Sequence, residues 1–185
     1  MNTSVKWLTR AAILLALALA VQSLRLGQYI TGPVVNAVLL SGAVLVGPWG
    51  AAAIGLLTPV TAYLLGQLNP VLAPAIPFIM AANAVLALIF GYGRRLNVYL
   101  AVVAAAVVKY LLLAGAVRYL LSLPPKVAVA LGVPQLITAL IGGAVALVVL
   151  EALAAARLLE RSRWPGLGLR RSESSGAGQT PSPRS

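Results

Sequence analysis

The chain has 185 residues, of which 61% are hydrophobic and 9% charged, and its mean hydropathy is +0.96. This composition excludes an ordinary soluble domain and is typical of a protein that crosses the bilayer several times. The formal net charge is +11, but the basic residues gather at segment ends and in the C-terminal tail. Membrane topology therefore explains them better than nucleic-acid binding, which favours a basic stripe with interleaved aromatic residues.

Several kinds of chemistry lack their usual residues in this sequence. It contains neither Cys nor His, and its only acidic residues are Glu151, Glu160 and Glu173. Without thiolates, imidazoles or paired carboxylates, it offers no disulfide, no common metal site and no general acid–base pair. We therefore expect no catalytic residue, no metal and no cofactor.

Gly, Pro and charged clusters divide the chain into six apolar stretches, each near the roughly 20 residues that a helix needs to cross the hydrocarbon core. We expect helices at about residues 7–25, 33–48, 50–66, 74–92, 98–121 and 130–158. The first follows Lys6 without a signal-peptide cleavage site, which favours a retained helix. The second and third are separated only by residues 47–50, GPWG, and should form a tight hairpin. A single re-entrant element is the alternative.

Charge predicts the orientation, because Lys and Arg are retained on the cytoplasmic side. Basic residues precede the first expected helix, separate the fourth from the fifth and follow the sixth: Lys6, Arg10, Arg94, Arg95, Arg157, Arg161, Arg163, Arg170 and Arg171. We predict an all-α polytopic membrane domain over residues 1–164, with six transmembrane helices and both termini cytoplasmic. Connections at 26–32, 67–73 and 122–132 then lie outside. Residues 165–185, rich in Gly, Ser, Pro and Arg, are expected to be a disordered cytoplasmic tail.

The first expected helix carries Ala12, Ala16 and Ala20 at intervals of four. This spacing aligns three small side chains on one face and permits close approach of another helix. The face is a candidate for docking a partner. Ordinary packing within the chain is the alternative, because alanine is abundant here.

Polar residues occur where two apolar segments meet. The segment QYITGPVVNAVLL, residues 28–40, ends in an Asn-Ala-Val-Leu sequence that recurs at residues 83–86. Amides at membrane depth are costly unless they are paired or used. We expect the following residues to approach one cavity near the outer surface: Thr31, Asn36, Gln67, Asn69, Asn83 and Gln135. Hydrogen bonding of each Asn to a neighbouring helix is an equally weighted alternative.

Lys109 lies near the middle of the fifth expected helix, where a cation costs about 3 kcal/mol on insertion scales. It needs water, a ligand or a partner such as backbone carbonyls. Arg25, Arg118 and Lys126 add positive charge near the outer surface, where no acidic residue balances it. An anionic solute would fit this charge, although snorkelling to the headgroups accounts for each of these three cations taken singly.

Pro59, which follows Thr58, is expected to perturb the third helix. Proline lacks an amide hydrogen and clashes with the preceding turn, so it kinks a helix and frees a carbonyl. The freed carbonyl could meet solute or a Thr hydroxyl, and simple curvature is an equally good interpretation.

These features together resemble the substrate-binding S components of energy-coupling factor (ECF) transporters, of the vitamin-type subgroup, over about residues 7–158. The resemblance is carried by the alanine-spaced first helix and by LRLGQYITGPVVNAVLL, GPWGAAAIGLLTPVTAYLLG and PAIPFIMAANAVL. It implies a multi-pass protein of a prokaryotic plasma membrane that captures a micronutrient with high affinity. It also implies a separate transmembrane coupling protein and a pair of cytoplasmic ATPases, and the chain has no GxxxxGK[ST] motif of its own.

The same resemblance assigns roles to particular residues. Ala12, Ala16 and Ala20 would contact the coupling protein. The substrate-binding candidates are Gln28, Thr31, Asn36, Asn83, Lys109 and Gln135. No riboflavin, thiamine, biotin or folate motif maps onto the chain, so the solute stays open. Two other functions are carried forward as alternatives: a self-contained secondary transporter or small channel, and a structural assembly protein of the membrane.

Overall fold

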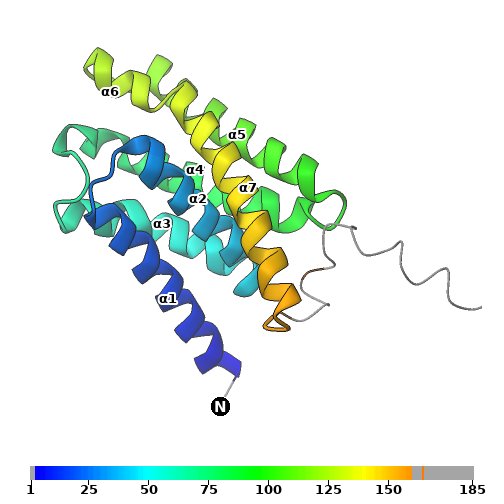
Figure 1. Cartoon of the computed structure of the whole chain (residues 1–185). Coiled ribbons are helices and arrows are strands. Elements are labelled where there is room, and N and C mark those ends of the chain that lie inside the picture. The colour runs from blue at the N-terminus through cyan, green and yellow to red at the C-terminus, as the bar shows by residue number, and fades with distance from the viewer. Residues whose placement is uncertain (1–2, 160–163, 165–185) are drawn as a thin grey trace, which may run out of the picture.

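The computed structural model describes residues 3–159 and 164. Six long helices make up the fold, together with a 3-10 helix and one short helix (Figure 1): α1 (Thr3–Ser23), α2 (Gln28–Leu45), α3 (Pro48–Leu64), η1 (Pro70–Ala75), α4 (Ile76–Gly93), α5 (Val98–Tyr119), α6 (Pro125–Ala130) and α7 (Val133–Ala155). Five helical segments of the described chain are long and apolar enough to cross a membrane. The remaining long helix, α3, has 17 residues and rises by about 25 Å, near the lower limit for a span. The prediction of an all-α polytopic membrane protein is confirmed.

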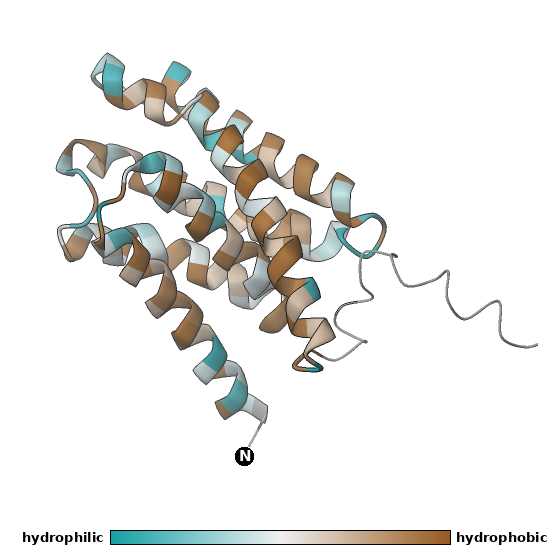
Figure 2. Ribbon diagram, viewed as in Figure 1, coloured by the Kyte–Doolittle hydropathy of each residue, from teal (hydrophilic) through white to brown (hydrophobic). Residues whose placement is uncertain are grey.

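The connections alternate between two ends of the helix bundle. Figure 1 shows the start of α1, the α2–α3 turn and the end of α7 at one end, and η1 and α6 at the other. We call the end with η1 and α6 the outer end, following the charge distribution, and the opposite end the inner end. Figure 2 shows hydrophobic residues along the helices and hydrophilic residues mainly near helix ends, as a protein surrounded by lipid requires.

The start of α2 differs from the prediction. The expected connection 26–32 is shorter, because Gly27, at φ 81°, turns the chain and its carbonyl accepts the Thr31 amide at 2.9 Å. The QYITG segment therefore forms the first turns of α2, and Pro33 lies inside the helix. Because proline has no amide hydrogen, its position near the start of α2 costs the helix only one backbone hydrogen bond. The other boundaries of the long helices fall within four residues of those expected.

Helices α2 and α3 form the predicted hairpin of two complete helices rather than a re-entrant element. Gly47, at φ 88°, makes the turn, a conformation that glycine adopts without steric cost. Trp7 of α1 packs against this turn and donates its Nε1 hydrogen to the Val46 carbonyl at 2.7 Å. This bond holds α1 against the hairpin at the inner end.

Two glycines allow helix backbones to touch beside the polar residues. A Cβ atom on Gly142 of α7 would lie 2.6 Å from both the Pro33 carbonyl and the Asn36 Cβ of α2. A Cβ on Gly55 of α3 would lie 3.0 Å from the Asn83 Cβ of α4. Small residues at crossings are how membrane helices gain close van der Waals packing. The same two contacts fix the positions of Asn36 and Asn83.

We expect Gly142→Ala to destabilise the protein by about 1–3 kcal/mol, because the added methyl group must separate α2 from α7. Thermal unfolding in detergent, followed by tryptophan fluorescence, measures the change. The matched control is Gly115→Ala in α5, where a Cβ meets nothing within 4 Å, and it should unfold at the temperature of the unaltered protein or above it. Equal transitions for the two variants would contradict the tight α2–α7 crossing.

Candidate functional site

Lys109 is the centre of the candidate site. Its side chain extends from α5 and is 3% exposed. Its Nζ donates to the Oδ1 of Asn36 at 2.7 Å and to the Oδ1 of Asn83 at 2.8 Å. Lys109 therefore neither reaches the headgroups nor pairs with backbone carbonyls. One ammonium joins α2, α4 and α5 in the interior of the bundle.

The charge of this ammonium has no acidic partner among the described residues. Glu151 is the one acidic residue in the described part of the chain, and its Oε2 accepts the Nε1 hydrogen of Trp164 at 3.0 Å, near the end of α7. A lysine ammonium has three N–H donors, and the two amide oxygens accept two of them. Within the described residues, the third donor of Lys109 is left over.

Pro59 and Gly55 orient the amide of Asn83. Because Pro59 has no amide hydrogen, the Gly55 carbonyl one turn earlier lacks its helical donor. The Nδ2 of Asn83 donates to that carbonyl at 3.4 Å, which leaves Oδ1 facing Lys109. The freed carbonyl thus accepts an amide hydrogen and not a threonine hydroxyl, since the Thr58 hydroxyl donates instead to the Ile54 carbonyl, at 2.6 Å.

A cavity lies between Lys109 and the outer end, and its solvent-accessible volume is about 110 Å³. All six residues predicted to bind substrate line it: Gln28, Thr31, Asn36, Asn83, Lys109 and Gln135. The structure thus brings the predicted set together, from α2, α4, α5 and α7. Gln22 and Thr58 also line the cavity and were not among the predicted substrate-binding residues, because neither belongs to the recurring Asn-Ala-Val-Leu sequence or to the polar segment before it.

A wider space, which we call the vestibule, adjoins this cavity and has a solvent-accessible volume of about 760 Å³. The two spaces share the lining residues Gln22, Gln28, Thr31 and Leu68. Gln67 and Asn69, which follow α3, line the vestibule only. The cavity is therefore reached from the outer end through a polar entrance.

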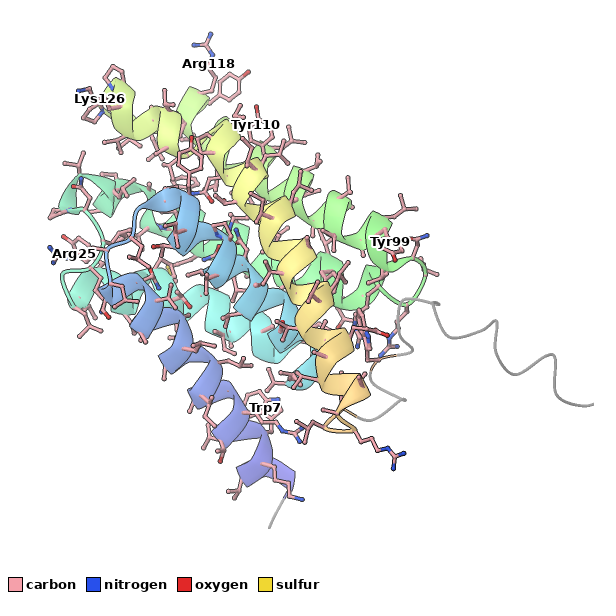
Figure 3. All side chains as sticks on the ribbon, in the orientation of Figure 1. Trp7, Arg25, Tyr99, Tyr110, Arg118 and Lys126 are labelled. Atoms are coloured by element: carbon pink, nitrogen blue, oxygen red, sulfur yellow. The ribbon has the colours of Figure 1, made fainter. Side chains whose placement is uncertain are left out.

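The four predicted cations divide into two groups. Arg25, at φ 51°, lines the vestibule, and its Nη2 donates to the Gly66 carbonyl at 3.1 Å, linking the α1–α2 and α3–η1 connections. Arg118 and Lys126 are exposed, lie at the outer end in Figure 3 and line neither space. Of these four cations, Lys109 and Arg25 are therefore the two that line the path.

The alanine face of α1 points away from the bundle. Ala12, Ala16 and Ala20 are all exposed, whereas Leu14 and Ala18 on the other face are buried. Within the described part of the chain, the three alanines therefore do not pack against another element. A flat face of small residues is available to another helix.

Because Lys109 donates to Asn36 and Asn83, we expect substitutions of an asparagine and of the lysine to change the stability of the protein by different amounts. We expect Asn36→Leu to lower the unfolding free energy by about 1.5–3 kcal/mol, because a buried ammonium loses one acceptor. Lys109→Met should leave the stability of the empty protein unchanged or raise it, because a buried charge is removed. Adding Lys109→Met to Asn36→Leu should restore part of the loss. Thermal unfolding of all three proteins checks this, and equal destabilisation by both single variants would contradict it.

Comparison with known proteins identifies the family of this chain. A family model described as the ECF transporter, substrate-specific component, matches residues 6–154, from the first turn of α1 to the last turn of α7. No curated protein and no solved structure matches the chain significantly. The family match covers most of the sequence and contains every residue that lines the cavity. The chain therefore belongs to the family of substrate-specific components of ECF transporters.

Proposed function

We propose that this protein captures a small organic micronutrient, preferentially an anion, at the outer end of its helix bundle and passes it to an ATP-driven importer in a prokaryotic plasma membrane. The observation that carries the proposal is Lys109, buried at the base of a cavity with two neutral amide partners. A buried cation without an acidic partner is costly at membrane depth. An anionic solute would offset that cost.

Two features support solute capture over the alternatives. A structural assembly protein has no need for a polar cavity that opens at one end, whereas an uptake subunit does. A secondary transporter commonly uses intramembrane acidic residues to couple solute to a proton or sodium gradient. Among the described residues only Glu151 is acidic, and it does not line the cavity.

Association with a coupling protein is proposed to occur through the alanine face of α1. The exposed positions of Ala12, Ala16 and Ala20 support this, because small residues let a partner helix approach closely. The coupling protein and its cytoplasmic ATPases would supply the energy. The predicted tail, residues 165–185, lies outside the described residues, and no role is assigned to it.

We expect Ala16→Trp to weaken association with the coupling protein by about tenfold or more, because an indole prevents helix approach at a cost above ~1.4 kcal/mol. Copurification of the two membrane proteins measures this. Leu111→Trp is the control, since Leu111 is 58% exposed on α5, which lies on the other side of the bundle from α1 (Figure 1). If both variants copurify normally, the docking surface is elsewhere.

The proposed function predicts that detergent-purified protein retains a small molecule identifiable by mass spectrometry. Lys109→Met should retain roughly tenfold less or lower, because a buried charged partner is lost. Cells that express the protein with its coupling subunits should accumulate the same molecule. Uptake without any ATPase would favour a secondary transporter, and the absence of both a retained molecule and uptake would overturn the proposal.

A further inference from the structure

We propose that the cargo has one carboxylate at its inner end, an apolar body and an uncharged polar group at its outer end, and that it binds with the carboxylate against Lys109. This inference rests on the proposed function, because it specifies the chemistry of the molecule that the cavity accepts. The cavity has three sections, which are its base at Lys109, its walls and its entrance, and each restricts one part of the cargo.

The base of the cavity supplies one positive charge and a small number of unused hydrogen-bond donors. Lys109 is the one basic residue among the described residues that line it. Lys109 keeps its third N–H, and Asn36 keeps its Nδ2 hydrogens, because no described residue accepts them. Thr58 donates its hydroxyl hydrogen, and Asn83 one of its two Nδ2 hydrogens, to carbonyls of α3. A carboxylate, with one charge and two oxygens, matches two donor groups around one cation.

A phosphate ester fits this base poorly. It carries about −1.5 to −2 charges at neutral pH and three strong acceptor oxygens. With Lys109 as its single cation, the base would leave part of that charge unbalanced in an apolar environment. The base therefore selects a carboxylate over a phosphate.

The walls below the entrance are mostly apolar. They are formed largely by side chains that offer no hydrogen bond, namely Val35, Leu72, Ile79 and Leu131, and Gln135 adds one amide. Hydroxyl or amide groups of the cargo out of reach of Gln135 would be buried without partners, at a cost of about 1–3 kcal/mol each. Hydrocarbon or aromatic surface is instead favoured by about 25 cal/mol per Å² buried. The body of the cargo is therefore apolar.

The entrance is polar and uncharged apart from Arg25. Gln22, Gln28 and Thr31 line both the cavity and the vestibule. Gln28 and Asn36 are eight residues apart on α2, which places them about 12 Å apart along the helix axis. A cargo that reaches from the base to these amide and hydroxyl groups is therefore about 10–12 Å long.

This arrangement also balances charge during uptake. The empty site has an ammonium held only by neutral dipoles, whereas a bound carboxylate makes the pair neutral. A neutral pair costs less within a bilayer than an isolated charge. Cargo binding therefore lowers the cost of any movement of the site through the membrane.

The test uses the molecule released from the purified protein. Coupling it to ethylamine with a carbodiimide joins the amine nitrogen to the acyl carbon, while the carboxyl oxygen leaves as the urea. We expect the mass of the molecule to increase by that of one ethylamine minus one water, which corresponds to a single carboxyl group. The emptied protein should bind the resulting monoamide roughly a hundredfold more weakly than the native molecule, because the charge pair with Lys109 is lost.

Two variants distinguish the effect of the lysine inside the cavity from the effect of removing any positive charge from the protein. Lys109→Met should bind the native molecule and its amide equally weakly. Lys126→Met removes an exposed lysine that lines neither space and should retain the preference of the unaltered protein for the acid. Titration calorimetry in detergent measures both.

The outcomes distinguish the two proposals. A released molecule that carries phosphorus, several carboxyls or no carboxyl would overturn the cargo class while leaving micronutrient capture intact. A released fatty acid would contradict the polar outer end. Absence of both a retained molecule and ATP-dependent uptake would instead overturn the proposed function.

Discussion

A single buried ammonium is the constraint on which the arrangement of this protein depends. A cation in the interior of a membrane protein needs acceptors, and Lys109 finds two on different helices, Asn36 and Asn83. Those acceptors must approach within hydrogen-bond distance, which in turn requires α2 and α4 to be held closely by their neighbours. Gly142 and Gly55 permit that approach, because either Cβ atom would collide with the opposite helix. The close packing of the helices and the hydrogen bonds of Lys109 therefore depend on each other.

The site also uses a defect in a helix. Pro59 removes one hydrogen bond from α3, and the Asn83 Nδ2 donates to the Gly55 carbonyl that this leaves without a helical donor. The Oδ1 of the same amide accepts from Lys109. Asn36 has no such second bond among the described residues. The two asparagines share an Asn-Ala-Val-Leu sequence and one ammonium partner, yet they differ in freedom. Asn83 is held by a second bond through one of its Nδ2 hydrogens, whereas neither Nδ2 hydrogen of Asn36 has a partner among the described residues.

Hydropathy, together with breaks at Gly, Pro and charged clusters, predicts the six long helices, because runs of about 20 apolar residues are typical of membrane spans. The cavity-lining residues are also visible in the sequence, since Asn36, Asn83 and Lys109 are polar at membrane depth. The rotation of each helix is not visible, because an alanine- and leucine-rich helix has no strongly polar face. Arg118 and Lys109 were considered together for their charge, but nine residues are two and a half turns, so the two side chains leave opposite faces of α5 and only Lys109 of the two lines the cavity. Sequence reasoning also placed the start of α2 too late, because a proline usually marks a helix beginning.

Helix α1 contributes to the entrance and not to the base. Its one cavity-lining residue is Gln22, at the outer end, while the base is built from α2, α4 and α5. The exposed Ala20 lies two residues before Gln22 on the same helix. A displacement of α1 would thus move the wall of the entrance. It would leave the Lys109 contacts in place, because neither Asn36 nor Asn83 depends on α1 for its hydrogen bond to Lys109. The entrance and the charged base are therefore built from different parts of the fold.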